Sequence, residues 1–83
     1  MNKTVEIKDV IRNFIHQHSF KDTSGITENT LLFKEGIFDS MGFVLLIDFL
    51  EERFGIITQD KEMIEENFES INALADFVQM RQI

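Results

Sequence analysis

One long amphipathic run, residues 40–54, constrains the fold of this chain more than any other feature. Asp39 and Ser40, two good capping residues, stand at its start, and Gly55 stands where a helix commonly ends. The sequence therefore predicts a helix from Ser40 to Phe54. Its apolar residues recur at i, i+3, i+4, i+7 and i+11, the spacing of one buried face, and these are Phe43, Leu46, Ile47, Leu50 and Phe54.

Two further segments have helical periodicity, and no segment alternates with the period of a β-strand. The first runs over about residues 5–18, and the last begins at Ser70, a good N-cap, and ends near Arg81. Residues 58–67 predict a short third helix whose only apolar anchors are Met63 and Ile64. This short helix should be the least stable element.

A stretch of about twenty residues, 19–39, separates the first two predicted helices and has no sustained periodicity. It holds too many apolar residues for a solvated linker, so we expect it to pack on the core, with Gly36 in a conformation that other residues avoid. A chain of 83 residues has room for one small core. We predict a single all-α domain, 1–83: a small bundle of three main helices plus a short third helix, with a long loop between the first two.

Charge and composition exclude several classes of function. The net charge is −7, of which residues 40–83 carry −6, so the surface repels phosphate backbones and favours basic partners over nucleic acid. The same charge could serve only solubility. There is no cysteine for a disulfide or a thiolate metal site. The charged start and the lack of a long apolar run lead us to expect no signal peptide, no membrane span and a cytoplasmic protein.

The sequence supports neither a hydrolase nor a metal site. A nucleophilic serine needs an adjacent base, and the G-x-S-x-G turn of many hydrolases is absent. His16 and His18 are the only histidines, and two residues apart on a helix they point in different directions and cannot share one metal ion. We therefore expect a protein that is not an enzyme and holds no metal.

Ser40 places a hydroxyl at the start of the predicted second helix, within residues 36–42 (GIFDSMG). The unpaired N–H groups and partial positive charge of a helix start favour anions, so a phosphodiester on Ser40 Oγ would be tolerated there. The plainer interpretation is that Asp39 or Ser40 only caps the helix. Capping by Asp39 would leave the Ser40 hydroxyl free, so the two interpretations are compatible.

From about residue 5 to residue 80, the order of these parts resembles the acyl carrier protein family. Asp39-Ser40-Met41 precedes an aliphatic run that ends in residues 51–56 (EERFGI), and residues 68–71 (FESI) lead into the last helix. The resemblance implies a 4'-phosphopantetheine arm on Ser40, with Asp39 as the flanking acid. The thiol of such an arm holds an acyl or aminoacyl group as a thioester and presents it to partner enzymes.

Within that family, the segment around Ser40 looks closest to the D-alanyl carrier proteins and related free-standing carriers. Carriers of fatty-acid synthesis usually have acids where this chain has Gly42 and Leu45. The resemblance therefore implies an aminoacyl or small acyl cargo and an amino-acid or specialised-metabolite pathway. The implied partners are a phosphopantetheinyl transferase, an adenylating acyl or aminoacyl ligase or synthase, and downstream acyl-processing enzymes, with the carrier as a monomer.

The second helix is the usual docking helix of the family, and the third often guards an acyl cavity. Carried over, these roles imply partner contacts at Met41, Val44, Leu45, Asp48, Glu51 and Glu52 in the second helix and at Met63 and Ile64 in the third. The alternative is an unmodified, carrier-shaped interaction module, in which Ser40 caps and the second helix binds a partner. Ser40→Ala separates the two, because it should abolish carrier function but leave an adaptor's affinity unchanged.

Overall fold

A computed structural model describes residues 3–19 and 22–82, and all regular structure within these ranges is helical. The predicted all-α fold is confirmed. The predicted domain, 1–83, also includes residues 1–2, 20–21 and 83, which lie outside the described part. Of these, residues 1–2 belong to the charged start of the chain and residues 20–21 to the predicted loop. The elements are α1 (Lys3–His18), α2 (Ser40–Phe54), the 3-10 turn η1 (Asp60–Glu62), α3 (Glu65–Phe68) and α4 (Ile71–Arg81).

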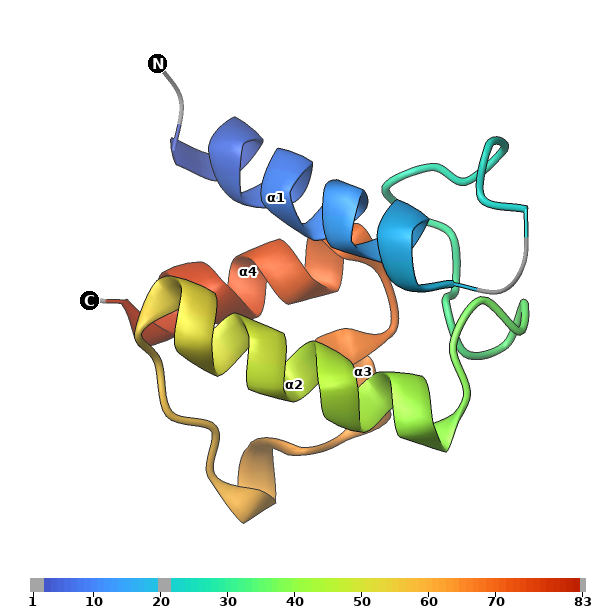
Figure 1. Ribbon diagram of the computed structural model, residues 1–83. Helices are drawn as coiled ribbons and strands as arrows, with labels where there is room; N and C mark the ends of the chain where they lie inside the picture. The colour runs from blue at the N-terminus through green and yellow to red at the C-terminus, as the bar shows by residue number, and fades with distance from the viewer. Residues whose placement is uncertain (1–2, 20–21, 83) are drawn as a thin grey trace.

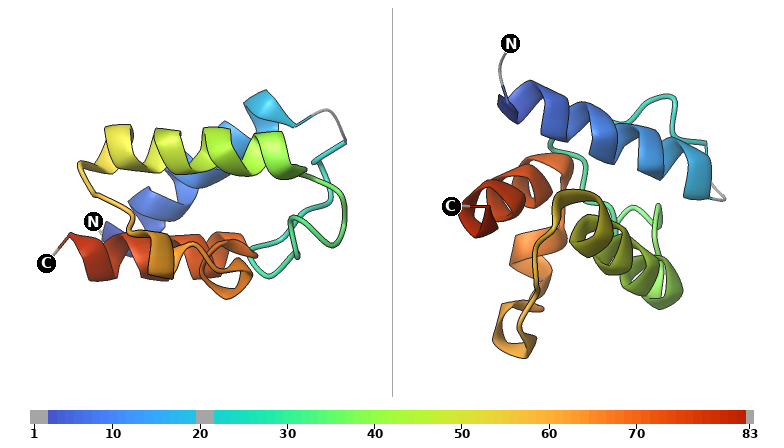
Figure 2. Two further views of the ribbon diagram at one scale, coloured as in Figure 1. Left: turned by 90° about the horizontal axis from the view of Figure 1, so that it is seen from below. Right: turned by 60° about the vertical axis from the view of Figure 1, so that its left-hand side comes forward.

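The three long helices surround one core. α1 and α4 pack against each other, and α2 runs in the same general direction as α4 while α1 runs the opposite way (Figures 1 and 2). α3 is a single short turn that packs on α4. No helix in the described part of the chain is long and apolar enough to cross a membrane.

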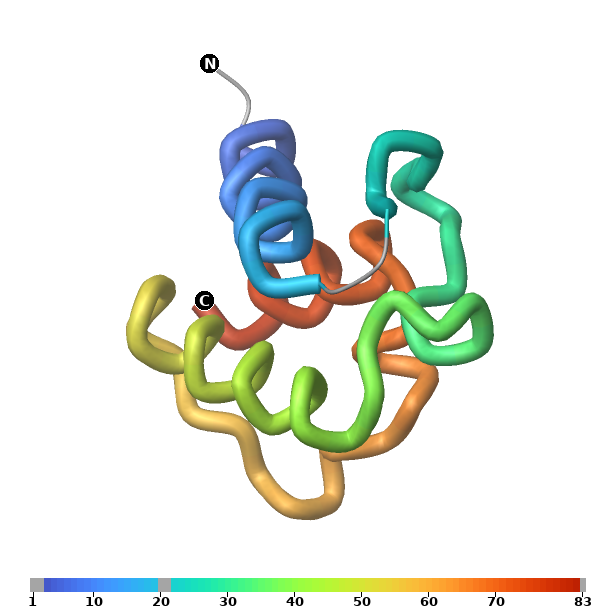
Figure 3. The backbone as a smooth tube through the Cα atoms, turned by 45° about the vertical axis from the view of Figure 1, so that its right-hand side comes forward, coloured from blue at the N-terminus to red at the C-terminus, as the bar shows by residue number. Residues whose placement is uncertain are grey.

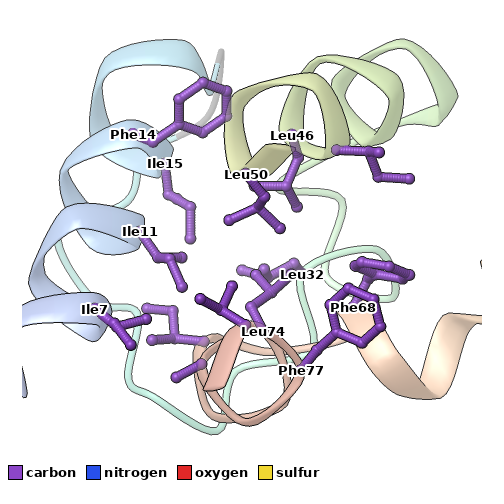
Figure 4. Close-up of a cluster of buried hydrophobic side chains, with 14 of the residues drawn as sticks. Ile7, Ile11, Phe14, Ile15, Leu32, Leu46, Leu50, Phe68, Leu74 and Phe77 are labelled. Carbon is purple, nitrogen blue, oxygen red and sulfur yellow. The ribbon is translucent and has the colours of Figure 1, made fainter. Parts of the chain in front are cut away.

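Side chains from α1, α2 and α4 meet in the core, with Leu32 of the long loop among them (Figure 4). Of the predicted stripe on α2, Leu46, Ile47 and Leu50 are buried, whereas Phe43 and Phe54 are partly buried at the edge of the core. The largest of the fully buried side chains are Ile11, Ile15, Leu32, Leu46, Leu50, Phe68, Ile71, Leu74 and Val78.

The loop between α1 and α2 packs on the core, as its apolar content predicts, and passes beside the α3–α4 connection (Figure 3). The Leu32 N–H donates to the Glu69 carbonyl at 2.7 Å, and the Glu28 carbonyl accepts from the Asn72 N–H at 3.0 Å. The Glu28 carboxylate also pairs with Lys8 at 2.9 Å, and this hydrogen bond lowers the pKa of Glu28 below its ordinary value. The loop is thus tied to both α1 and α4.

α2 begins and ends where the sequence predicts. Oδ1 of Asp39 accepts a hydrogen bond from the Gly42 N–H at 2.9 Å. At the other end Gly55 has a left-handed φ of 67°, and its N–H donates to the Glu51 carbonyl at 3.0 Å. Gly36, in the loop before α2, also has a positive φ of 75°, as expected. Local signals therefore fix the start of the helix that carries Ser40.

The predicted third helix over residues 58–67 is divided in two. η1 and α3 are separated by Met63 and Ile64, and Ile64 has an extended backbone. The Asn67 side chain donates to the Glu62 carbonyl at 2.8 Å, an acceptor that a continuous helix would use for the N–H four residues on. Both apolar anchors are exposed, so no buried face holds a longer helix together.

Candidate functional site

Ser40 is the first residue of α2, and its side chain is exposed. The carboxylate of Asp39 performs the capping, through its bond with the Gly42 N–H. Within residues 3–19 and 22–82 the Ser40 hydroxyl has no hydrogen-bond partner. The structure therefore selects Asp39 as the cap, and the start of α2 does not depend on the Ser40 hydroxyl.

The electrostatics around Ser40 favour a single attached anion. α2 is 15 residues long and has no acidic residue in its first turn, so its positive end is offset by little beyond the capping Asp39. An anion at such an exposed helix start is stabilised by about 0.3–1 kcal/mol. Among the described residues, no histidine lines either of the two spaces that Ser40 itself lines.

An open cleft of about 470 Å³ lies on one side of Ser40, and we call it the aromatic cleft. Of the two residues predicted to guard a cavity, Met63 lines this cleft, and Ile64 is exposed and does not. Glu65 also lines the cleft, and no pattern in the sequence indicated this residue. The complete lining is Phe33, Phe38, Asp39, Ser40, Phe43, Met63 and Glu65.

A second, smaller hollow of about 340 Å³ lies on the side of α2 that faces α1. Buried Phe38 lines both spaces, and Asp39 is the other residue that they share. Gly42 leaves room for the Phe38 ring, because a Cβ at this position would lie 2.6 Å from Phe38 Cδ1. The lining is His18, Gly36, Ile37, Phe38, Asp39, Met41, Gly42 and Leu45.

Three apolar side chains on α2 form an exposed surface, which we call the α2 strip: Met41, Val44 and Leu45. Their exposed fractions are 69%, 51% and 49%, so the long loop does not cover them. Exposed apolar groups of this size, bordered by polar residues, mark interaction surfaces. Met41 and Val44 also line a space of about 490 Å³ together with Asp39 and Ser40, which brings the strip next to Ser40.

The acidic residues predicted on the docking face differ in their surroundings. Asp48 and Glu52 are exposed. Glu51 is half-buried, and its Oε2 accepts a hydrogen bond from the Thr58 N–H at 2.8 Å. Glu51 therefore holds the chain that follows α2. In the described residues no three histidine, aspartate or glutamate side chains are grouped closely enough to hold a metal ion.

Comparison with known proteins identifies relatives of one kind. Two D-alanyl carrier proteins, from Streptococcus suis strains 05ZYH33 and 98HAH33, are each 34% identical to this chain over 70 residues. In each case the match covers 84% of this chain and 87% of the relative. No family model matches the chain.

Proposed function

This chain belongs to the acyl carrier protein family, and from that premise we propose that Ser40 carries a 4'-phosphopantetheine arm. Members of this family are carriers and are not themselves enzymes. The observation that carries the proposal is the division of roles at the start of α2: Asp39 caps the helix, and the Ser40 hydroxyl is exposed and unpaired among the described residues. Such a hydroxyl can be esterified without loss of the cap.

The residues around Ser40 fit the arm in charge and in space. The phosphate would lie at the positive end of α2, and the aromatic cleft, which Ser40 itself lines, offers room beside it. When bound, the arm supplies a thiol that holds an acyl or aminoacyl group as a thioester. The protein's own residues fix the start of α2 and leave Ser40 accessible to partner enzymes.

The family and the α2 strip support a proposal for the cargo and the partners. The relatives are named as carriers of D-alanyl groups, which supports an aminoacyl or small acyl cargo and an amino-acid or specialised-metabolite pathway in the cytoplasm. The partners are a phosphopantetheinyl transferase, an adenylating ligase or synthase, and the enzymes that use the loaded carrier. Tethering raises the local concentration of the cargo at each of them.

Intact-mass measurement after incubation with coenzyme A and a broad-specificity phosphopantetheinyl transferase tests the attachment. The unchanged protein should gain one arm, and Ser40→Ala should gain none. Ser24→Ala is the matched control, because Ser24 is exposed but lies in the loop, and this variant should gain one arm. If folded, unchanged protein gains nothing with several transferases, the unmodified interaction module becomes the better interpretation.

Matched substitutions on two helices test docking through the α2 strip. Leu45 on α2 and Val5 on α1 have exposed fractions of 49% and 50%, so a glutamate at either position costs little burial. Leu45→Glu should slow arm transfer by about tenfold, the effect of losing a contact worth about 1.4 kcal/mol, while Val5→Glu should leave the rate unchanged. Equal rates for the two variants would argue against docking through this surface.

A further inference from the structure

Four phenylalanine rings form a continuous row that leads from the aromatic cleft into the core. Phe33 and Phe43 line the cleft, and their ring centroids are 5.3 Å apart in an edge-to-face arrangement. Phe43 meets Phe68 in the same way at 5.3 Å, and Phe68 meets Phe77 at 5.0 Å. Edge-to-face pairs at this spacing attract each other, so the rings hold one another in place.

Phe43 is the point at which this row passes from the cleft to the interior. Its ring is partly buried, with the cleft on one side and Phe68 on the other. Phe68 has an exposed fraction of 0%, and it belongs with Leu32 to the cluster of core side chains (Figure 4). Behind the Phe43 ring there is therefore close-packed apolar interior, which accepts no additional groups without displacement of side chains.

We propose that Phe43 limits the size of the cargo, because its ring closes the aromatic cleft toward the core. A short acyl or aminoacyl group can lie in the open cleft, whose other lining includes the polar side chains of Asp39, Ser40 and Glu65. A long alkyl chain would extend out of the open cleft into solvent, because the close-packed interior behind the Phe43 ring offers it no further burial. This inference rests on the proposed function, since the cargo reaches the cleft on an arm attached to Ser40.

The test compares arms that carry an acetyl or an octanoyl group, with the melting temperature as the readout. In the unchanged protein the two loaded forms should melt at the same temperature. Phe43→Ala removes the ring and opens the cleft to an apolar space beside Phe68, of the kind that stays dry and binds apolar groups. The substitution should lower the melting temperature. The octanoyl form of this variant should recover most of that fall, and the acetyl form should not.

Phe49→Ala is the matched control. Phe49 lies on the same helix and is also partly buried, but its ring stacks on Phe14 at 4.3 Å, on the side that faces α1, and it does not line the cleft. Its octanoyl and acetyl forms should melt together. A rescue of both variants, or a higher melting temperature of the octanoyl form in the unchanged protein, would overturn the role of Phe43.

Two further measurements keep the inference separate from the proposed function and from a failure to fold. If Phe43→Ala does not fold, Phe43→Leu replaces it. The difference in melting temperature between its octanoyl and acetyl forms should have the same sign and be smaller. If no arm can be attached, the proposed function fails, and the closure is then tested on unmodified protein with 1-octanol. The alcohol should raise the melting temperature of the Phe43 variant and not that of the unchanged protein, and an equal response would overturn the inference.

Discussion

Asp39→Ala and Ser40→Ala should have opposite consequences, although the two residues are adjacent at the start of α2. The carboxylate of Asp39 accepts the hydrogen bond from the Gly42 N–H at 2.9 Å, and its loss leaves that donor without a protein partner. Removal of a cap of this kind costs about 0.5–2 kcal/mol. In a domain of this size about 1 kcal/mol corresponds to about 4–8 °C, so the melting temperature should fall by about 2–16 °C.

Ser40→Ala should change the stability by less than about 0.5 kcal/mol, because the described structure shows no bond of the Ser40 hydroxyl to lose and alanine is a good helix former. The assay is urea and thermal unfolding of the unmodified proteins, followed by circular dichroism. Asp39→Asn is the control for charge, since asparagine caps as well as aspartate does and should retain most of the stability.

The reasoning would be refuted if Ser40→Ala lost as much stability as Asp39→Ala, or if Asp39→Ala lost none. Either result would mean that the Ser40 hydroxyl takes part in the cap. The division of roles between these residues would then no longer support an attachment site at Ser40.

Three other substitutions test separate parts of the structure. Gly42→Ala places a Cβ 2.6 Å from Phe38 Cδ1. Although alanine favours the helix more than glycine does, the free energy of unfolding measured in urea should still fall by about 1 kcal/mol. A more stable variant would contradict this contact. Gly55→Ala forces alanine to a φ of 67° and should cost about 1–2 kcal/mol in thermal unfolding, whereas an unchanged melting temperature would count against a left-handed residue there. The hydrogen bond from Lys8 lowers the pKa of Glu28 from its ordinary 4.5. The ion pair therefore stabilises the folded state fully at a pH above that value, and this stabilisation is lost as the pH falls through the folded-state pKa of Glu28. Glu28→Gln should therefore lose less stability than the unchanged protein between about pH 6 and about pH 3, and an equal loss would show that this ion pair does not hold the loop.

Elements with strong local signals were predictable from the sequence. Asp39 and Gly55 bracket α2, and Ser70 caps α4 by accepting a hydrogen bond from the Ala73 N–H at 3.1 Å. The all-α fold and the packed loop were also correct. α1 begins at Lys3, two residues earlier than predicted, a difference within the usual uncertainty of helix ends.

The features that the sequence did not reveal depend on contacts between distant residues. The loop is placed by the bond between Leu32 and Glu69, which no local pattern encodes. The third helix is divided where the Asn67 side chain takes the Glu62 carbonyl. The aromatic cleft joins Phe33, before α2, with Met63, just after η1, and Glu65 of α3, so its lining could not be read from the sequence before these segments were brought together.

Mapping the serine to which the arm is attached tests the proposed role of Ser40 most directly. After arm transfer, the protein is digested and the modified peptide is fragmented in a mass spectrometer, which distinguishes Ser40 from the other three serines of the chain, Ser19, Ser24 and Ser70. We predict a single phosphopantetheine group on Ser40. An arm on any other serine, or modified protein without an arm at Ser40, would contradict the account.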